Sequence, residues 1–118
     1  MKIGTDITVV SRIEKTLAKF GDKFLDKFLN QEEQQELSSK TESIAGYWSA
    51  KEAIAKALGC GIGKELSFHD ILLYKDEKKA PHFKLTDDAQ KRHNIKGSSI
   101  SIAHDGGFAI AVAVISFY

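Results

Sequence analysis

Apolar residues change their spacing part-way along the chain. Up to the glycine cluster at 59–63 they recur mostly at three- and four-residue intervals, which is typical of amphipathic helices. Beyond it they gather in short runs typical of strands, and an opening β-branched run at 3–10 also predicts a strand. This order predicts an α+β fold, in which N-terminal helices pack on an antiparallel sheet that includes the first strand.

Capping residues predict where helices begin. Ser11 with Glu14 has the spacing of a capping box and predicts a helix over 12–21. Asn30 with Glu33 has the same spacing and predicts a polar, exposed helix. The other predicted segments are a helical turn or two at 24–29, a long helix at 43–58, a hairpin of strands 68–74 and 82–85, a short helix at 87–93, and strands 98–104 and 108–117 joined by a tight turn at 105–107.

The last predicted strand is apolar on both of its alternating faces. One face carries Phe108, Ile110, Val112, Val114 and Ser116, and the other carries Ala109, Ala111, Ala113, Ile115 and Phe117. Helices of a chain this size can cover one face of a sheet, so a second covered face needs another subunit. The pattern therefore predicts an oligomer; the alternative is that helices of the same chain wrap both faces.

The long predicted helix carries charges among alanines and bulky apolar residues. At 100° per residue, Lys51 projects near the middle of its broad apolar face, and Glu52 lies at the edge of that face next to Trp48. Lys56 follows one turn after Glu52. Because such a helix is enclosed on most sides, these charges must snorkel, pair or meet a charged ligand.

Composition argues against several classes of function. The 118 residues suit a single domain over 1–118, and 17 basic against 16 acidic residues argue against nucleic-acid binding by overall charge. The only cysteine, Cys60, excludes an intramolecular disulfide and a cysteine-rich zinc site. No apolar run approaches the roughly 18 residues of a membrane span, so we expect a soluble, cytoplasmic protein without membrane contact.

Familiar catalytic motifs are absent, including HExxH, GxSxG, paired CxxC and the P-loop spacing. Three chemically active residues remain: Asp6 interrupts an apolar strand, Glu52 sits on the enclosed helix, and His104 ends a strand before a Gly-Gly turn. Two carboxylates without thiols suit a hard cation such as magnesium, which takes further oxygens from substrate phosphates. The residues equally allow a turn at Asp6, an i, i+4 pair of Glu52 with Lys56, and a hairpin-closing histidine.

Five segments of the chain resemble one known family. They are GTDITVVSRI, FLNQEE, WSAKEAIAKALGCGIG, FHDILL and SISIAH, in the family's order and spacing. The sequence is similar to the holo-acyl-carrier-protein synthases, the small bacterial phosphopantetheinyl transferases. This resemblance implies transfer of 4′-phosphopantetheine from coenzyme A to a serine of acyl carrier protein, with release of adenosine 3′,5′-bisphosphate. It also implies a homotrimer that supports fatty acid biosynthesis.

The site that the resemblance implies consists of a magnesium pair and a set of coenzyme A contacts. Asp6 and Glu52 match the family's magnesium ligands, and with Lys56 they form the implied catalytic set. The implied coenzyme A contacts are Lys56, Gly61, Gly63 and His104.

One position departs from the family's pattern. Tyr47 stands where many members have a basic residue, which leaves one phosphate contact without its usual side chain. Lys40 or Lys51 would have to supply the missing charge.

A basic stripe on the first predicted helix indicates a protein partner. Arg12, Lys15 and Lys19 fall on one face, and Lys23 extends it if helical geometry resumes after Gly21. Arg12 also matches the arginine that the resemblance associates with carrier-protein docking. A basic stripe on a nearly neutral protein suits an acidic partner such as acyl carrier protein, and the alternative is a solvated face without a partner.

Two other functions fit the same residues. A magnesium-dependent nucleotide pyrophosphohydrolase would use water in place of serine, and a non-catalytic oligomeric module would bind nucleotide or a partner protein without chemistry. Cleavage of coenzyme A without an acceptor favours the hydrolase. Binding without any cleavage favours the module.

Overall fold

The computed structural model describes residues 1–118, and its elements follow the predicted order. They are β1 (Lys2–Val9), α1 (Val10–Phe20), α2 (Asp22–Phe28), α3 (Gln31–Glu36), α4 (Thr41–Ala57), the 3₁₀ turn η1 (Phe68–Asp70), β2 (Ile71–Lys75), β3 (Pro81–Leu85), α5 (Asp87–His93), β4 (Ile95–Asp105) and β5 (Phe108–Phe117). The predicted α+β class is confirmed. No helix is both long and apolar enough to cross a membrane.

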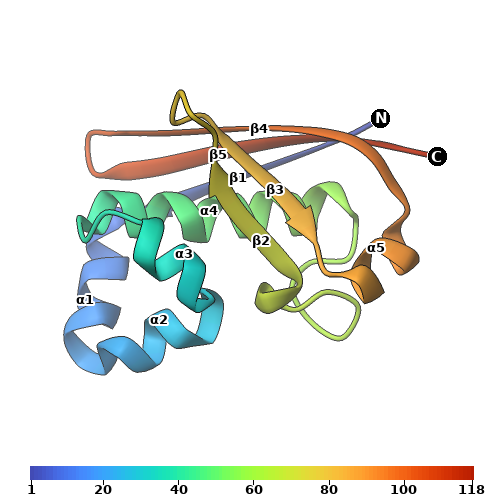
Figure 1. Cartoon of the computed structure of the whole chain (residues 1–118). Coiled ribbons are helices and arrows are strands. Elements are labelled where there is room, and N and C mark those ends of the chain that lie inside the picture. Colours follow the sequence, from blue (N-terminus) through green and yellow to red (C-terminus); the bar gives the residue numbers. More distant parts are fainter.

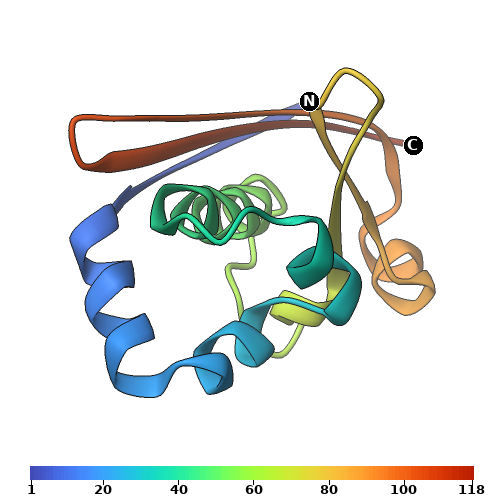
Figure 2. The same cartoon turned by 60° about the vertical axis from the view of Figure 1, so that its left-hand side comes forward.

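The main sheet has three antiparallel strands in the order β1-β5-β4, so the predicted first strand does join it. The hairpin β2-β3 forms a separate two-stranded sheet. Helix α4 runs along one face of the main sheet, and the other helices lie on the same side as α4 (Figures 1 and 2). Alanine side chains of β5 and α4 are fully buried in the core between the sheet and α4.

Close packing of β1 on α4 depends on a glycine. A Cβ atom at Gly4 would collide with the backbone of Ala53 and Ala57 on α4. Because residue 4 carries no side chain, the two backbones can approach each other, and Asp6 on β1 comes near Glu52 on α4.

The first helix begins at Val10, so the predicted start at Arg12 with a Ser11 cap is wrong. Val9 occupies the N-cap position and no side chain caps the helix. The Val10 amide instead donates to the Gly107 carbonyl at 2.9 Å, in the turn between β4 and β5. The first amide of the helix has no acceptor within the helix, and the Gly107 carbonyl supplies one. The strand can therefore continue directly into the helix without a side-chain cap.

Helix α3 has the predicted capping box and is the polar, largely exposed helix that its sequence predicts, with one buried residue. The Asn30 side chain accepts from the Glu33 amide, and the Glu33 carboxylate accepts from the Asn30 amide. Glu33 itself is buried, with 1% of its surface exposed, because its carboxylate pairs with Lys51 of α4. A residue that is polar by sequence therefore belongs to the protein interior.

One face of the main sheet is covered and the other is not. On β5 the covered positions are Ala109, Ala111, Ala113 and Ile115, all fully buried. The opposite face leaves large apolar side chains exposed: Ile3 (66%), Ile7 (60%), Phe108 (45%) and Ile110 (44%). The alternative that helices of the same chain wrap both faces is therefore wrong. We call these four residues the open sheet face.

Candidate active site

A cleft of about 580 Å³ opens between β1, α1, α2 and α4. Its lining combines carboxylates, cations and apolar side chains: Asp6, Ile7, Thr8, Val9, Arg12, Ile13, Thr16, Phe20, Lys23, Phe24, Lys27, Trp48 and Glu52. The two carboxylates come from elements far apart in the sequence, and the three cations come from α1 and α2. Such a cleft can hold an anionic ligand that has an apolar part.

Asp6 is held in place by two side chains. The Thr8 hydroxyl donates to one carboxylate oxygen of Asp6 at 3.0 Å, and Lys56 Nζ pairs with the other at 3.0 Å. Thr8 Oγ1 also lies 2.5 Å from the buried Ser49 hydroxyl on α4. The carboxylate is thus oriented by partners on β1 and α4. Lys56 does not form the i, i+4 pair with Glu52 that the sequence allowed, because it reaches Asp6 instead.

Glu52 sits in an environment that disfavours its charge. Burial raises the pKa of Glu52, the nearby Asp6 carboxylate raises it further, and only Lys56 opposes the shift. A cation placed between the two carboxylates would relieve this repulsion. The structure contains no cluster of three or more His, Cys, Asp or Glu side chains arranged to hold a metal. The two carboxylates are therefore the candidate metal ligands. Two carboxylates suit Mg²⁺, which keeps several waters and takes further oxygens from phosphates.

The structure brings some of the predicted site residues together and leaves others apart. Asp6, Glu52 and Arg12 line the same cleft, and Lys56 contacts Asp6 from its edge. His104 lies elsewhere, in depressions beside the turn between β4 and β5. The remaining predicted residues lie outside the cleft lining: Gly61 and Gly63 in the loop after α4, and Lys15 and Lys19 on the exposed side of α1.

Two cleft residues were missed by sequence reasoning. Thr8 orients Asp6, and Lys27 adds a cation from α2. Lys27 follows Lys23 by one helical turn, and this i, i+4 spacing is the signal that would have found it.

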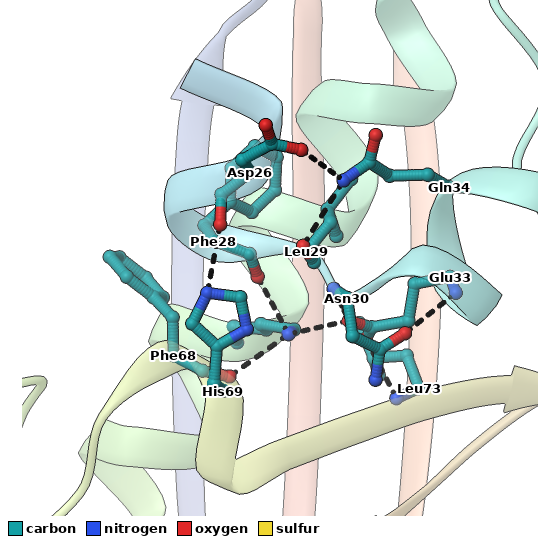
Figure 3. Close-up of polar contacts among 10 residues, drawn as sticks. Asp26, Phe28, Leu29, Asn30, Glu33, Gln34, Phe68, His69 and Leu73 are labelled. Atoms are coloured by element: carbon teal, nitrogen blue, oxygen red, sulfur yellow. Dashed lines mark hydrogen bonds and ion pairs between the residues drawn. The ribbon is translucent and has the colours of Figure 1, made fainter. Parts of the chain in front are cut away.

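Lys51 is not available to bind phosphate, so the hypothesis that it replaces the basic residue missing at Tyr47 is wrong. Its ammonium group is buried and donates to Glu33 and to the carbonyls of Phe28 and Phe68, at 2.9, 2.7 and 2.9 Å (Figure 3). An ammonium group has only three hydrogens, so none remains for a ligand. Tyr47 is buried too, and burial, followed by the charges of Glu36 and Glu33, raises its pKa to about 12.

Comparison with models of known protein families shows which family the chain belongs to. The family model described as the 4′-phosphopantetheinyl transferase superfamily matches residues 2–113. The chain belongs to this superfamily. The resemblance seen in its motifs is therefore confirmed, and the chain is a member of an enzyme family.

The similarity to individual phosphopantetheinyl transferases extends over almost the whole chain. The holo-[acyl-carrier-protein] synthase of Sulfurovum sp. is 56% identical over 117 residues, which are 99% of this chain and 98% of that protein. The crystal structure of the Helicobacter pylori enzyme in complex with coenzyme A has a TM-score of 0.94 at 49% identity and covers 97% of this chain and 99% of that one. The Bacillus anthracis enzyme in complex with CoA (3′,5′-ADP) has a TM-score of 0.82 at 36% identity, covering 99% and 96%.

Proposed function

We propose that this chain transfers 4′-phosphopantetheine from coenzyme A to a serine hydroxyl of apo acyl carrier protein and releases adenosine 3′,5′-bisphosphate. The observation that carries the proposal is the pair of carboxylates, Asp6 and Glu52, in a cleft bordered by cations. It agrees with the name of the Sulfurovum relative and with the coenzyme A complex of the Helicobacter pylori enzyme. The reaction would serve fatty acid biosynthesis in the cytoplasm.

Asp6 and Glu52 would hold Mg²⁺, as their mutual repulsion favours. When bound, Mg²⁺ supplies positive charge that stabilises the pyrophosphate oxygens of coenzyme A as the phosphorus–oxygen bond breaks. Lys56 would add a second positive charge from this chain. Its side chain is 55% exposed, so it can turn from Asp6 towards a phosphate at the mouth of the cleft.

The serine of the carrier protein must lose a proton when its oxygen attacks the phosphorus that bears pantetheine. One of the two carboxylates, Asp6 or Glu52, would accept this proton, because both line the cleft into which the serine would be delivered. The electron pair of the broken phosphorus–oxygen bond leaves with the adenosine bisphosphate. Enclosure by Trp48 of α4 would exclude water, which otherwise competes with serine.

Basic residues on α1 and α2 would bind the acidic carrier protein. Arg12 and Lys23 border the cleft, and Lys15 and Lys19 are exposed on α1. An acidic helix lying across α1 would meet all four cations, and its serine would be delivered to the carboxylates.

The active form in this proposal is a homotrimer. The open sheet face is apolar and uncovered in a single chain, which supports burial against other subunits. His104 lies at the exposed end of β4, outside the lining of the cleft that contains the carboxylates. It would therefore contact coenzyme A bound in a neighbouring subunit, where Gly61 and Gly63 of that subunit would border the nucleotide.

Intact-mass measurement tests the function directly. Apo acyl carrier protein incubated with the protein, Mg²⁺ and coenzyme A should gain the mass of one phosphopantetheine group. Parallel reactions lack the carrier protein: bisphosphate released in these would favour the pyrophosphohydrolase. Coenzyme A binding without release in either reaction would favour a non-catalytic module.

A further inference from the structure

Helix α2 forms one wall of the cleft, although it is too short to be stable alone. It spans Asp22–Phe28, seven residues, and contributes Lys23, Phe24 and Lys27 to the lining. Isolated helices of this length are unstable in water, so the position of the wall depends on tertiary contacts.

The carbonyl end of α2 is held by three side chains from other segments. Lys51 Nζ of α4 donates to Phe28 O at 2.7 Å, His69 Nε2 donates to Asp26 O at 2.8 Å, and Gln34 Nε2 donates to Leu29 O at 3.2 Å (Figure 3). Gln34 also donates to the Asp26 carboxylate at 3.0 Å. Carbonyls at a helix end have no partners within the helix, and here α4, α3 and η1 supply them.

Of these three side chains only Lys51 is buried, and it is fixed by Glu33. One carboxylate oxygen of Glu33 accepts from Lys51 Nζ and from the Asn30 amide, each at 2.9 Å, and the other accepts from the Leu73 amide at 2.9 Å. A single ion pair therefore joins α4 to the end of α2, the start of α3, η1 and β2. Aromatic rings of Phe24, Phe28, Trp48 and Phe68 pack beside it.

Lys51 is adjacent to Glu52, but the two side chains face different parts of the molecule. Glu52 lines the cleft, whereas Lys51 points to the carbonyl end of α2. Helix α4 thus carries one carboxylate of the reaction site and also anchors the opposite cationic wall.

We propose that the Glu33–Lys51 pair is a positioning device, which holds α2 at the distance from α4 at which Lys23 and Lys27 meet the carrier protein. This rests on the proposed function. Neither residue touches a substrate, so both act through α2. Loosening α2 should weaken carrier binding and leave the coenzyme A contacts and the carboxylate pair in place.

The test replaces both charges with neutral side chains of similar shape, as Lys51→Met with Glu33→Gln. Neutral replacement of a buried ion pair often preserves stability, whereas removal of one partner leaves an uncompensated charge. We expect the KM for carrier protein to rise about tenfold or more, because small displacements of binding groups are costly. The KM for coenzyme A and the kcat should stay within about threefold. Hydrogen exchange should become faster in peptides covering 22–29.

A surface variant keeps the test decisive if the double variant fails to fold. His69→Ala removes an exposed hydrogen bond to the Asp26 carbonyl of α2. It should raise the KM for carrier protein and the rate of hydrogen exchange in 22–29, as the double variant does but by a smaller factor. His82→Ala is the matched control, since His82 is also exposed and bonded to one acceptor, Asp76, but on the β2-β3 hairpin. It should change neither measurement.

Folded variants with carrier KM and α2 exchange equal to wild type would overturn the positioning role. Equal increases in both KM values with a fall in kcat would also overturn it, because they would indicate general loss of structure. If the wild-type protein transfers no phosphopantetheine, the proposed function fails, and the exchange measurement alone then decides whether the pair holds α2.

Discussion

At the residue scale, the proposed reaction site contains two carboxylates whose surroundings differ. Asp6 accepts a hydrogen bond from Thr8 and forms an ion pair with Lys56. Glu52 is different, because burial and the neighbouring Asp6 carboxylate raise its pKa. The two carboxylates repel each other, and a bound cation would offset this repulsion. Their proposed role therefore predicts opposite effects on activity and on stability.

Asp6→Asn and Glu52→Gln should each reduce phosphopantetheine transfer at least about a hundredfold, because each removes charge that stabilises the reacting phosphate. Initial rates from intact-mass spectra of the carrier protein measure this. Circular dichroism spectra should match wild type. Near-normal transfer by either folded variant would reject that residue as a ligand.

Glu52→Gln should also raise the melting temperature at pH 7 in EDTA. Because the pKa of Glu52 is raised in the folded protein, the folded state binds more protons than the unfolded state just above pH 4.5, and stability falls as pH rises through this range. The neutral variant escapes that loss. Its advantage should shrink as pH falls below 4.5, where both states carry a protonated Glu52. A melting temperature below wild type at pH 7 would contradict the direction of the pKa shift.

At the scale of elements, the cleft exists because β1, α1, α2 and α4 approach closely. The contact of β1 with α4 requires a glycine, and the wall made by α2 requires partners for its free carbonyls. Neither contact involves residues that would bind substrate. Both determine where the residues that we propose to bind substrate lie.

Gly4→Ala should destabilise the protein by about 3 kcal/mol, because the added methyl group collides with the backbone of α4 and must push β1 away. Chemical denaturation measures the change. The matched control is Gly63→Ala, where a Cβ meets nothing within 4 Å, and the change should lie within about 0.5 kcal/mol. Equal stability of the two variants would contradict the close approach.

Charge reversal on α1, as Arg12→Glu with Lys15→Glu and Lys19→Glu, should raise the KM for carrier protein far more than the KM for coenzyme A. The reason is that opposite charges attract an acidic partner and like charges repel it. The wild-type KM for carrier protein should also increase with salt, which screens exposed charges. Kinetics that do not depend on salt would count against electrostatic docking.

At the scale of the whole molecule, the sheet separates a covered face from an open one. Helix α4 covers the alanine face of β5, and Ile3, Ile7, Phe108 and Ile110 face outwards. Figure 2 shows every helix on the same side of this sheet. An apolar surface of this kind favours association with other copies of the chain.

We expect an active trimer that loses activity on dilution before it loses secondary structure. Ile110→Asp should prevent assembly and abolish transfer, because it places a charge where subunits would meet. Tyr74→Asp is the matched control, since Tyr74 is similarly exposed at 42% but lies on the β2-β3 hairpin. Light scattering and sedimentation at assay concentrations measure the mass. A fully active monomer would refute the proposal.

The order of elements and the family could be determined from the sequence alone. Hydrophobic spacing and capping residues depend on neighbours in the chain, so they predicted the strands, the capping box of Asn30 with Glu33 and the long helix. The motifs around Asp6 and Glu52 singled out both carboxylates, and the structure places them in the lining of one cleft.

Only the tertiary structure decided which partner each charge meets. Lys51 and Lys56 lie on the same helix, yet Lys51 is buried against Glu33 and Phe28, and Lys56 reaches Asp6 at the surface. The start of α1 likewise depends on the Gly107 carbonyl. Such contacts join residues that are distant in the chain, and the free energy of burying a charge depends on how all surrounding segments pack. A pattern of neighbours along the sequence does not contain that information.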